Sequence, residues 1–143
     1  MNDRNGWRFP WQVFFSELVG TALLVLIGLS MVILMFGAGS PMIRVVPSEG
    51  ARRLITGFLF GATGALIALS PVGKESGAHI NPIVTLGFWL MGKLDSRFAL
   101  GYGLAQLTGA CMGVCHYLAG DRWAGAWRSA PLCRAKATLL GPL

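Results

Sequence analysis

An uncharged stretch of the sequence, residues 76–92, holds the side chains with the clearest chemical potential, and Asn81-Pro82 interrupts it. Asn is a preferred N-cap, and Pro is favoured at the first position of a helix. The pair therefore predicts a helix that begins at Asn81 and covers about 82–91. Its positive N-terminal end opposes cations, and the Asn81 amide can donate hydrogen bonds to a neutral solute.

The composition indicates that the elements around this helix are membrane spans. Of 143 residues, 54% are hydrophobic and 13% are charged, with a mean hydropathy of +0.60, whereas a soluble domain has about 25% charged residues. A helix needs about 20 apolar residues to cross a bilayer. Three further uncharged stretches reach that length: residues 18–43, 54–73 and 98–120. We therefore predict an all-α membrane protein with three transmembrane helices, over about 11–36, 54–69 and 98–118, joined by loops at 37–52 and 70–80.

The net charge of +6 does not indicate a nucleic-acid partner. In a membrane protein, basic residues mostly occupy the loops and the ends of the spans. The composition thus excludes a soluble domain and a nucleic-acid module, and the lipid bilayer is the predicted surrounding.

The helix at 82–91 is too short to cross the membrane. Ten residues give about 15 Å, about half of the roughly 30 Å hydrocarbon core. Non-helical backbone at membrane depth is tolerated only where it is buried in protein or lines a wet cavity. We therefore predict a re-entrant half-helix, a pattern that points to a solute site near the bilayer midplane.

Two polar side chains, Glu17 and Gln106, lie inside or at the edge of the predicted spans. An intramembrane carboxylate usually faces the bundle interior or a wet cavity; the alternative for Glu17 is an interfacial acid in contact with water. For Gln106, we expect a hydrogen bond to backbone that is otherwise unsatisfied within the membrane.

Small residues recur every four positions on two of the predicted spans. Such rows let helix backbones approach closely, which predicts a close-packed bundle. The rows are Gly57, Gly61 and Ala65 on the second span, and Gly101, Ala105, Gly109 and Gly113 on the third.

The three cysteines do not form a framework of paired bridges. Cys111 and Cys115 lie four residues apart, and with His116 they could bind a soft metal, but small buried residues are the favoured interpretation. Neither a metal nor another cofactor is predicted. Cys133 lies in a basic C-terminal segment.

Three motifs resemble those of the aquaporin and glycerol-facilitator family. Residues 76–85, SGAHINPIVT, are similar to its first signature loop, with Ile83 in place of the Ala of the usual Asn-Pro-Ala triplet. Residues 17–21, ELVGT, match its first-helix pattern, and residues 105–110, AQLTGA, match its third helix. The order and spacing are those of the family, and the resemblance covers roughly residues 11–118.

The resemblance implies roles for the residues of the loop. Asn81 would orient permeating molecules, Pro82 would begin the half-helix, and Ile83 would narrow the waist or change its packing. His79 would brace the loop. Selectivity in such channels depends on the pore diameter, hydrogen bonds and electrostatic barriers.

The resemblance also implies roles for residues of the spans. Glu17 and Gln106 would hold the re-entrant backbone by hydrogen bonds. The residue of the second span that faces the filter is either Phe60 or Gly61; Phe would narrow the pore, and Gly would widen it.

Members of the family contain two inverted halves, and residues 1–120 resemble the first. The second Asn-Pro-Ala loop and the arginine that follows it are not found, so we expect this half to be incomplete as a pore. Residues 121–143 form an atypical basic tail, and our hypothesis is that it comes from a shifted reading frame or a truncated gene.

The leading functional prediction is a multi-pass channel polypeptide of the cell membrane for passive transport of water or a small neutral solute such as glycerol. The alternative is a non-conducting membrane protein with a structural or interaction role. A homo-oligomer, such as an antiparallel pair of copies that rebuilds a two-fold pore, is a third hypothesis. An enzyme is not predicted, because Ser76, His79 and Glu17 show no nucleophile–base spacing.

Overall fold

The structure is a computed structural model that describes residues 11–37 and 39–119. Three long helices dominate it: α1 (Trp11–Phe36), α3 (Glu49–Leu69) and α6 (Ser96–Ala119). Each is long and apolar enough to cross a membrane. The prediction of an all-α protein with three spans is confirmed. The predicted tail over 121–143 lies outside the described residues.

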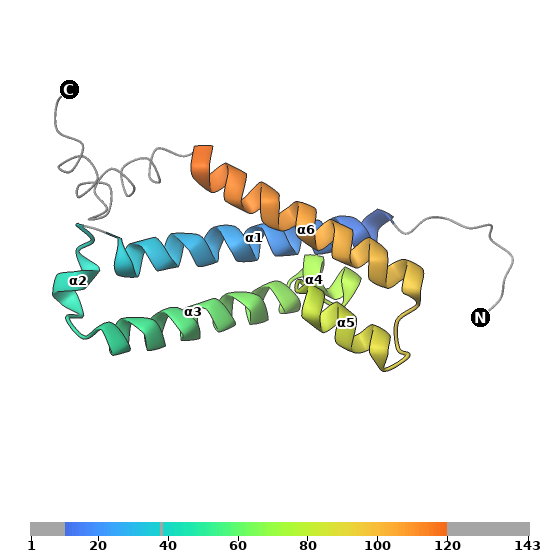
Figure 1. Cartoon of the computed structure of the whole chain (residues 1–143), viewed down its shortest axis with the longest axis horizontal. Coiled ribbons are helices and arrows are strands. Elements are labelled where there is room, and N and C mark those ends of the chain that lie inside the picture. The colour runs from blue at the N-terminus through green and yellow to red at the C-terminus, as the bar shows by residue number, and fades with distance from the viewer. Residues whose placement is uncertain (1–10, 38, 120–143) are drawn as a thin grey trace, which may run out of the picture.

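Helix α1 contacts both other long helices, as Figure 1 shows for the bundle as a whole. The Phe14 ring of α1 meets the Phe98 ring near the start of α6, with centroids 6.0 Å apart. Further along, Ala22 of α1 lies against Gly113 of α6. The two helices therefore run parallel, and α3 returns in the opposite direction on another side of α1.

Glycines on α6 allow this close approach. A Cβ atom added to Gly109 would overlap the carbonyl oxygen of Leu18, and one added to Gly113 would come 2.7 Å from the carbonyl oxygen of Ala22. The row of small residues on α6 thus packs against α1, as expected. On α3, by contrast, Gly57 and Gly61 have no described neighbour within 4 Å of an added Cβ, so that row does not pack within the described part of the chain.

The connection predicted as a loop over 37–52 contains more helix than expected. A short helix α2 (Met42–Val45) lies within it, and α3 begins at Glu49 rather than near residue 54. Ser48 is the N-cap of α3, and its hydroxyl accepts a hydrogen bond from the Ala51 backbone at 3.3 Å. The prediction ended the helix at the first charges, but Glu49 and Arg53 pair with each other at the surface, and Arg52 donates hydrogen bonds to carbonyl oxygens of the connection.

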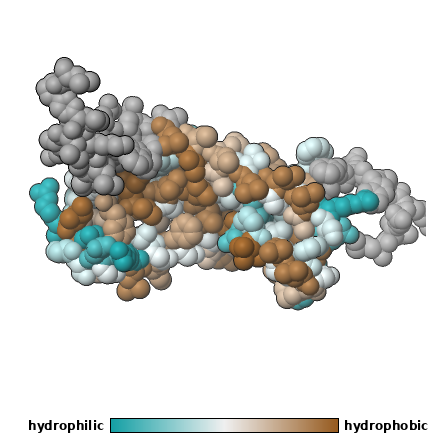
Figure 2. Space-filling view, in the orientation of Figure 1, coloured by the Kyte–Doolittle hydropathy of each residue, from teal (hydrophilic) through white to brown (hydrophobic). Residues whose placement is uncertain are grey.

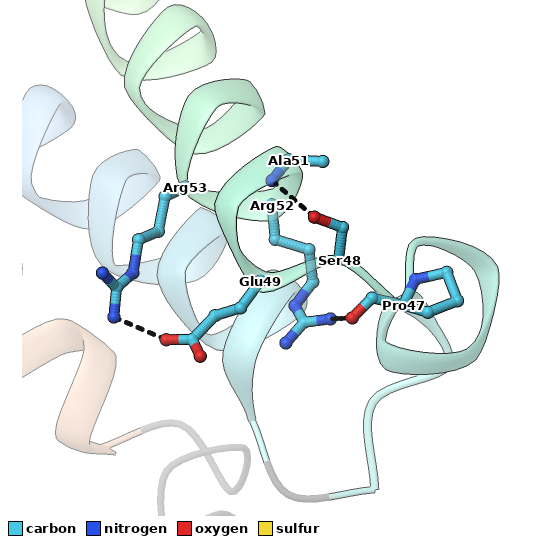
Figure 3. A network of polar contacts seen from close by, with 6 residues as sticks. All are labelled: Pro47, Ser48, Glu49, Ala51, Arg52 and Arg53. Carbon is cyan, nitrogen blue, oxygen red and sulfur yellow. Dashed lines mark hydrogen bonds and ion pairs between the residues drawn. The ribbon is translucent and has the colours of Figure 1, made fainter.

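Arg52 of α3 bonds to the connection that precedes its helix, and Figure 3 shows its hydrogen bond with Pro47. Its Nη1 atom donates to the carbonyl oxygens of Val46 at 2.7 Å and Pro47 at 3.0 Å. The guanidinium also lies 5.5 Å from the centroid of the Phe36 ring, at the end of α1. Arg52 is buried, whereas its neighbour Arg53 forms an exposed ion pair with Glu49.

The segment predicted as a second loop, residues 70–80, also contains a helix, α4 (Pro71–Ser76). The Ser70 hydroxyl caps it by accepting a hydrogen bond from Gly73 at 3.3 Å. A Cβ on Gly73 would overlap the carbonyl oxygen of Ile67, so only glycine permits this tight reversal after α3. Gly77, with a φ of 82°, then ends α4 in the left-handed region.

Helix α5 (Pro82–Leu90) follows and packs against α6. Apart from its C-terminal end, one residue earlier than expected, it is the short helix predicted from Asn81-Pro82. Figure 2 shows that apolar residues cover much of the surface along the long helices, with hydrophilic residues gathered near α2 and the start of α3. Large apolar side chains stand exposed on α3 and α5, among them Leu54, Phe58, Ile83 and Leu90.

Candidate functional site

The non-helical backbone between α4 and α5 is held by one carboxylate of α1. Glu17 is fully buried, at 0% exposure. Its Oε1 accepts a hydrogen bond from the His79 backbone at 2.9 Å, and its Oε2 accepts one from the Ile80 backbone at 2.7 Å. Glu17 therefore satisfies two successive backbone donors that neither helix can satisfy, and it is not an interfacial acid in contact with water.

Gln106 of α6 joins the same carboxylate from another side. Its Nε2 donates to Glu17 Oε2 at 2.7 Å and to the Thr85 hydroxyl of α5 at 2.9 Å. The side chain is 1% exposed. One buried amide thus links α1, α5 and α6. The expectation from sequence was a bond to backbone; the observed partners of Gln106 are two side chains, and the backbone contacts belong to Glu17.

His79 is enclosed by neighbours on several sides. Its Nδ1 lies 3.2 Å from the Thr85 hydroxyl. Its ring stacks on Phe88 with centroids 4.7 Å apart and meets the edge of Tyr102 at 5.0 Å. The Tyr102 hydroxyl donates to the Ser76 carbonyl at 2.8 Å, at the end of α4. These contacts place His79 among groups that hold the loop in position.

Thr85, Phe88 and Tyr102 are members of this network that the sequence reasoning missed. A signal existed for two of them, because residues four apart share one face of a helix. Thr85 follows Asn81 by four residues, and Tyr102 precedes Gln106 by four. Phe88 carries no comparable signal, since every face of α5 carries apolar residues.

Asn81 caps α5 from outside this network. Its Oδ1 accepts a hydrogen bond from the Ile83 backbone at 2.9 Å, and Pro82 follows at the first helical position. Among the described residues, the Nδ2 group makes no hydrogen bond. Asn81 and Pro82 are exposed, and Ile83 is 72% exposed. The N-terminus of α5 therefore presents amide donors on an uncovered side of the described chain.

Phe60 and Gly61, the two alternatives for the second span, have different surroundings. The Phe60 ring covers Gly28 of α1, where an added Cβ would overlap it. An added Cβ on Gly61 would meet nothing within 4 Å. Within the described residues, no hydrogen bond or ring contact joins either of them to Asn81.

Among residues 11–37 and 39–119, no group of three or more His, Cys, Asp or Glu side chains could hold a metal ion. Cys111 and Cys115 are exposed on α6, so the interpretation as small buried residues is wrong. The reason is that α6 buries its glycine face against α1 and leaves the cysteines on another face. Cys133 lies outside the described residues.

Comparison with known proteins defines the class. A family model described as "Major intrinsic protein" matches residues 4–120. The chain is 37% identical over 104 residues to the lens fiber major intrinsic protein of Gallus gallus, covering 73% of this chain and 35% of that protein. It is 34% identical over 122 residues to the probable aquaporin AqpM of Archaeoglobus fulgidus, covering 74% of this chain and 46% of that protein.

A third relative is the glycerol uptake facilitator protein of Streptococcus pneumoniae, 34% identical over 99 residues, which cover 69% of this chain and 39% of that protein. The alignments thus span less than half the length of these curated relatives. No solved structure matches the chain. The chain is a membrane protein, and it belongs to the major intrinsic protein family.

Proposed function

We propose that this chain contributes to a channel through which water or a small neutral solute such as glycerol crosses the cell membrane passively. The observation that carries the proposal is the half-helix α5, whose preceding backbone is held by Glu17 and whose Thr85 is bonded to Gln106. The names of two relatives, an aquaporin and a glycerol uptake facilitator, support the same function.

The proposed chemistry needs no covalent step and no cofactor. The Asn81 amide donates hydrogen bonds to the oxygen of a passing molecule, because its Oδ1 is engaged in capping and its Nδ2 is not bonded to another described residue. The partial positive charge at the N-terminus of α5 repels cations. Together these features favour a neutral solute that carries an acceptor oxygen.

We assign the wide position of the pathway to Gly61. Its open surroundings and the packing of Phe60 over Gly28 support this choice between the two alternatives. The exposed Ile83 stands beside Asn81 and takes the place of a smaller residue at the waist. In this proposal, Glu17, Gln106 and His79 position the loop and do not contact the solute.

The described residues provide one half-helix of this kind, and its Asn81 end is uncovered. We therefore propose that residues 11–119 need an opposed half, from another segment or from a second copy of the chain, to enclose a pathway. In the alternative, the chain stays in the membrane without conducting and has a structural or interaction role.

The test is transport in liposomes of the full chain. Shrinkage is timed by stopped-flow light scattering after a step in sucrose, for water, and after a step in glycerol, for the solute. We expect rates above those of empty liposomes and above those of liposomes that carry Asn81→Asp. Rates equal to empty liposomes, with the protein shown to be inserted and folded, would support the non-conducting alternative.

A second measurement tests the antiparallel pair. Single cysteines are introduced at Ser48 and at Asp95, in a chain whose own cysteines are replaced, and labelled from each side of the membrane with a reagent that does not cross it. Labelling of each position from both sides indicates dual insertion. Labelling from one side throughout rejects the antiparallel pair.

A further inference from the structure

Two buried polar atoms have no hydrogen-bond partner among the described residues. One is Oγ1 of Thr21, one turn after Glu17 on α1, and the other is Oε1 of Gln106, whose amide nitrogen is bonded to Glu17. The side chains are 4% and 1% exposed. Buried polar groups nearly always have a partner, which is either protein or an ordered water. Two unpartnered acceptors near one carboxylate therefore require an explanation.

The Thr21 hydroxyl is unlike other hydroxyls on the helices of this chain. Those of Ser30, Thr56, Thr63 and Thr108 each donate to the carbonyl oxygen four residues back, at 2.8 Å in every case. The Thr21 hydroxyl makes no such bond to the Glu17 carbonyl. Its capacity both to donate and to accept is therefore directed elsewhere.

The orientation of the Gln106 amide is determined by its other contacts. Its Nε2 donates to Glu17 Oε2 and to Thr85 Oγ1, so its Oε1 must point away from the carboxylate. Turning the amide over would set Oε1 against Glu17 Oε2, acceptor against acceptor. A flip of the amide therefore cannot relieve the unpartnered oxygen.

Thr21 and Gln106 lie on the two helices that pack together, and Glu17 lies one turn before Thr21 and is bonded to Gln106. Gln106 is bonded to Glu17, and Thr21 follows Glu17 by four residues on α1, a rise of about 6 Å. The α6 glycines that follow Gln106 face this part of α1, with Gly109 against Leu18. Two hydrogen bonds of about 2.8 Å, placed end to end through one oxygen, span about 5.6 Å.

We propose that a single water molecule is bound between Thr21 Oγ1 and Gln106 Oε1, behind the loop that precedes α5. It donates one hydrogen to Gln106 Oε1 and forms its second hydrogen bond with the Thr21 hydroxyl. This water belongs to the fold, as buried waters with otherwise unsatisfied partners do. It is distinct from any water that permeates, and the proposal does not depend on transport.

The direct test is an experimental structure of the full chain in lipid at better than about 2 Å. We expect an ordered water within about 3.2 Å of both Thr21 Oγ1 and Gln106 Oε1. A structure with no water there, and with the Thr21 hydroxyl bonded to the Glu17 carbonyl, would overturn the proposal.

An independent test uses the sign of a stability change. Thr21→Val keeps the shape of the side chain and removes the hydroxyl. If the hydroxyl were truly unpartnered, its removal would leave the melting temperature unchanged or raise it, because an unsatisfied buried polar group is lost. If it holds a water, the melting temperature falls, by about 3–6 °C for one hydrogen bond in a chain of this size.

Two further variants show whether the change in melting temperature of Thr21→Val comes from the loss of its hydroxyl. Thr21→Ser keeps the hydroxyl, and we expect it to recover most of the loss. Thr63→Val is the matched control, since Thr63 is 7% exposed and its hydroxyl is bonded to its own helix. A melting temperature for Thr21→Val at or above that of the wild type contradicts the bound water, whatever the transport assays show.

Discussion

Gln106 of α6 and Glu17 of α1, 89 residues apart in the sequence, are joined by a 2.7 Å hydrogen bond in the interior of the protein. The same carboxylate accepts hydrogen bonds from the backbone of His79 and Ile80. The start of α5 is thus located by two long helices rather than by its own short sequence. Any function that depends on Asn81 depends on this pair.

Replacing Glu17 by Gln should destabilise the fold strongly. Two carboxylate oxygens accept three N–H groups, and an amide would set an NH2 group against at least one of them. Because hydrogen bonds to a charged group contribute about 1.5–3 kcal/mol each, we expect a loss of at least about 2 kcal/mol. Thermal unfolding in detergent measures this loss of stability.

The control is Glu49→Gln, which breaks an exposed ion pair with Arg53 and should change stability by less than about 0.5 kcal/mol. Equal effects would contradict the role given to Glu17.

Replacing Gly109 by Ala should separate α1 from α6. The new methyl group would overlap the carbonyl oxygen of Leu18, which cannot move without shifting the helix. We expect a loss of about 1–3 kcal/mol, as for other overpacked sites. Gly103→Ala on the same helix is the matched control, because an added Cβ there meets nothing within 4 Å. It should be neutral or stabilise the helix by up to about 1 kcal/mol. The unfolding curve of Gly109→Ala should therefore move to lower stability, while that of Gly103→Ala stays in place or moves to higher stability.

Two substitutions of Asn81 should separate capping from transport. Asn81→Ala removes the acceptor for the Ile83 backbone and should cost about 1 kcal/mol. Asn81→Asp keeps that acceptor and adds a negative charge that the helix N-terminus tolerates. The aspartate variant should therefore unfold near the wild-type temperature while solute flux falls towards that of empty liposomes, because the amide donors are gone. Wild-type flux in a folded Asn81→Asp channel would remove Asn81 from the proposed pathway.

Gly61 should control the size of the solute. Gly61→Trp would fill the open space beside α3, so we expect glycerol flux to fall several-fold and water flux to fall less. Leu66→Trp is the control, on an exposed position about 140° further around the same helix. If both tryptophans reduce glycerol flux equally, the effect is one of membrane insertion and not of the pathway.

Arg52 should matter more than its neighbour Arg53, although both are arginines in the first turns of α3. Arg52→Ala removes two hydrogen bonds to the carbonyls of Val46 and Pro47 and the contact with Phe36. We expect it to lower stability by about 2 kcal/mol. Arg53→Ala breaks only the exposed pair with Glu49 and should cost less than about 0.5 kcal/mol. Chemical denaturation of the two variants in the same detergent measures the difference.

Much of the fold could be predicted because its elements are local. Long uncharged stretches specify the spans by length and hydropathy alone, and Asn81-Pro82 specifies the start of α5 by capping chemistry. The predicted loops over 37–52 and 70–80 were wrong in part, because helices begin within them at Glu49 and Pro71. Charged residues and glycines in a sequence favour the prediction of a loop. In the structure, Ser48 and Ser70 are the N-caps of α3 and α4 in these segments.

Contacts between residues far apart in the sequence were predicted less well than the helices. Glu17 and Gln106 stood out as polar residues in apolar surroundings, but their shared partner Thr85 did not, and neither did Tyr102. The glycine row indicated one packed face of α6, but the sequence pattern did not show that the face with Cys111 and Cys115 has no covering helix among the described residues. This is why Cys111 and Cys115 were placed inside although they are exposed.

In the uncharged stretch at residues 76–92, some features follow from the sequence alone and others from the tertiary structure. The sequence by itself determined that a short helix begins at Asn81 and cannot span a membrane, because capping and length depend only on neighbouring residues. The tertiary structure alone decided how that helix is held, because the free energy of a buried carboxylate depends on which donors surround it. Those donors come from segments 62 to 89 residues away from Glu17.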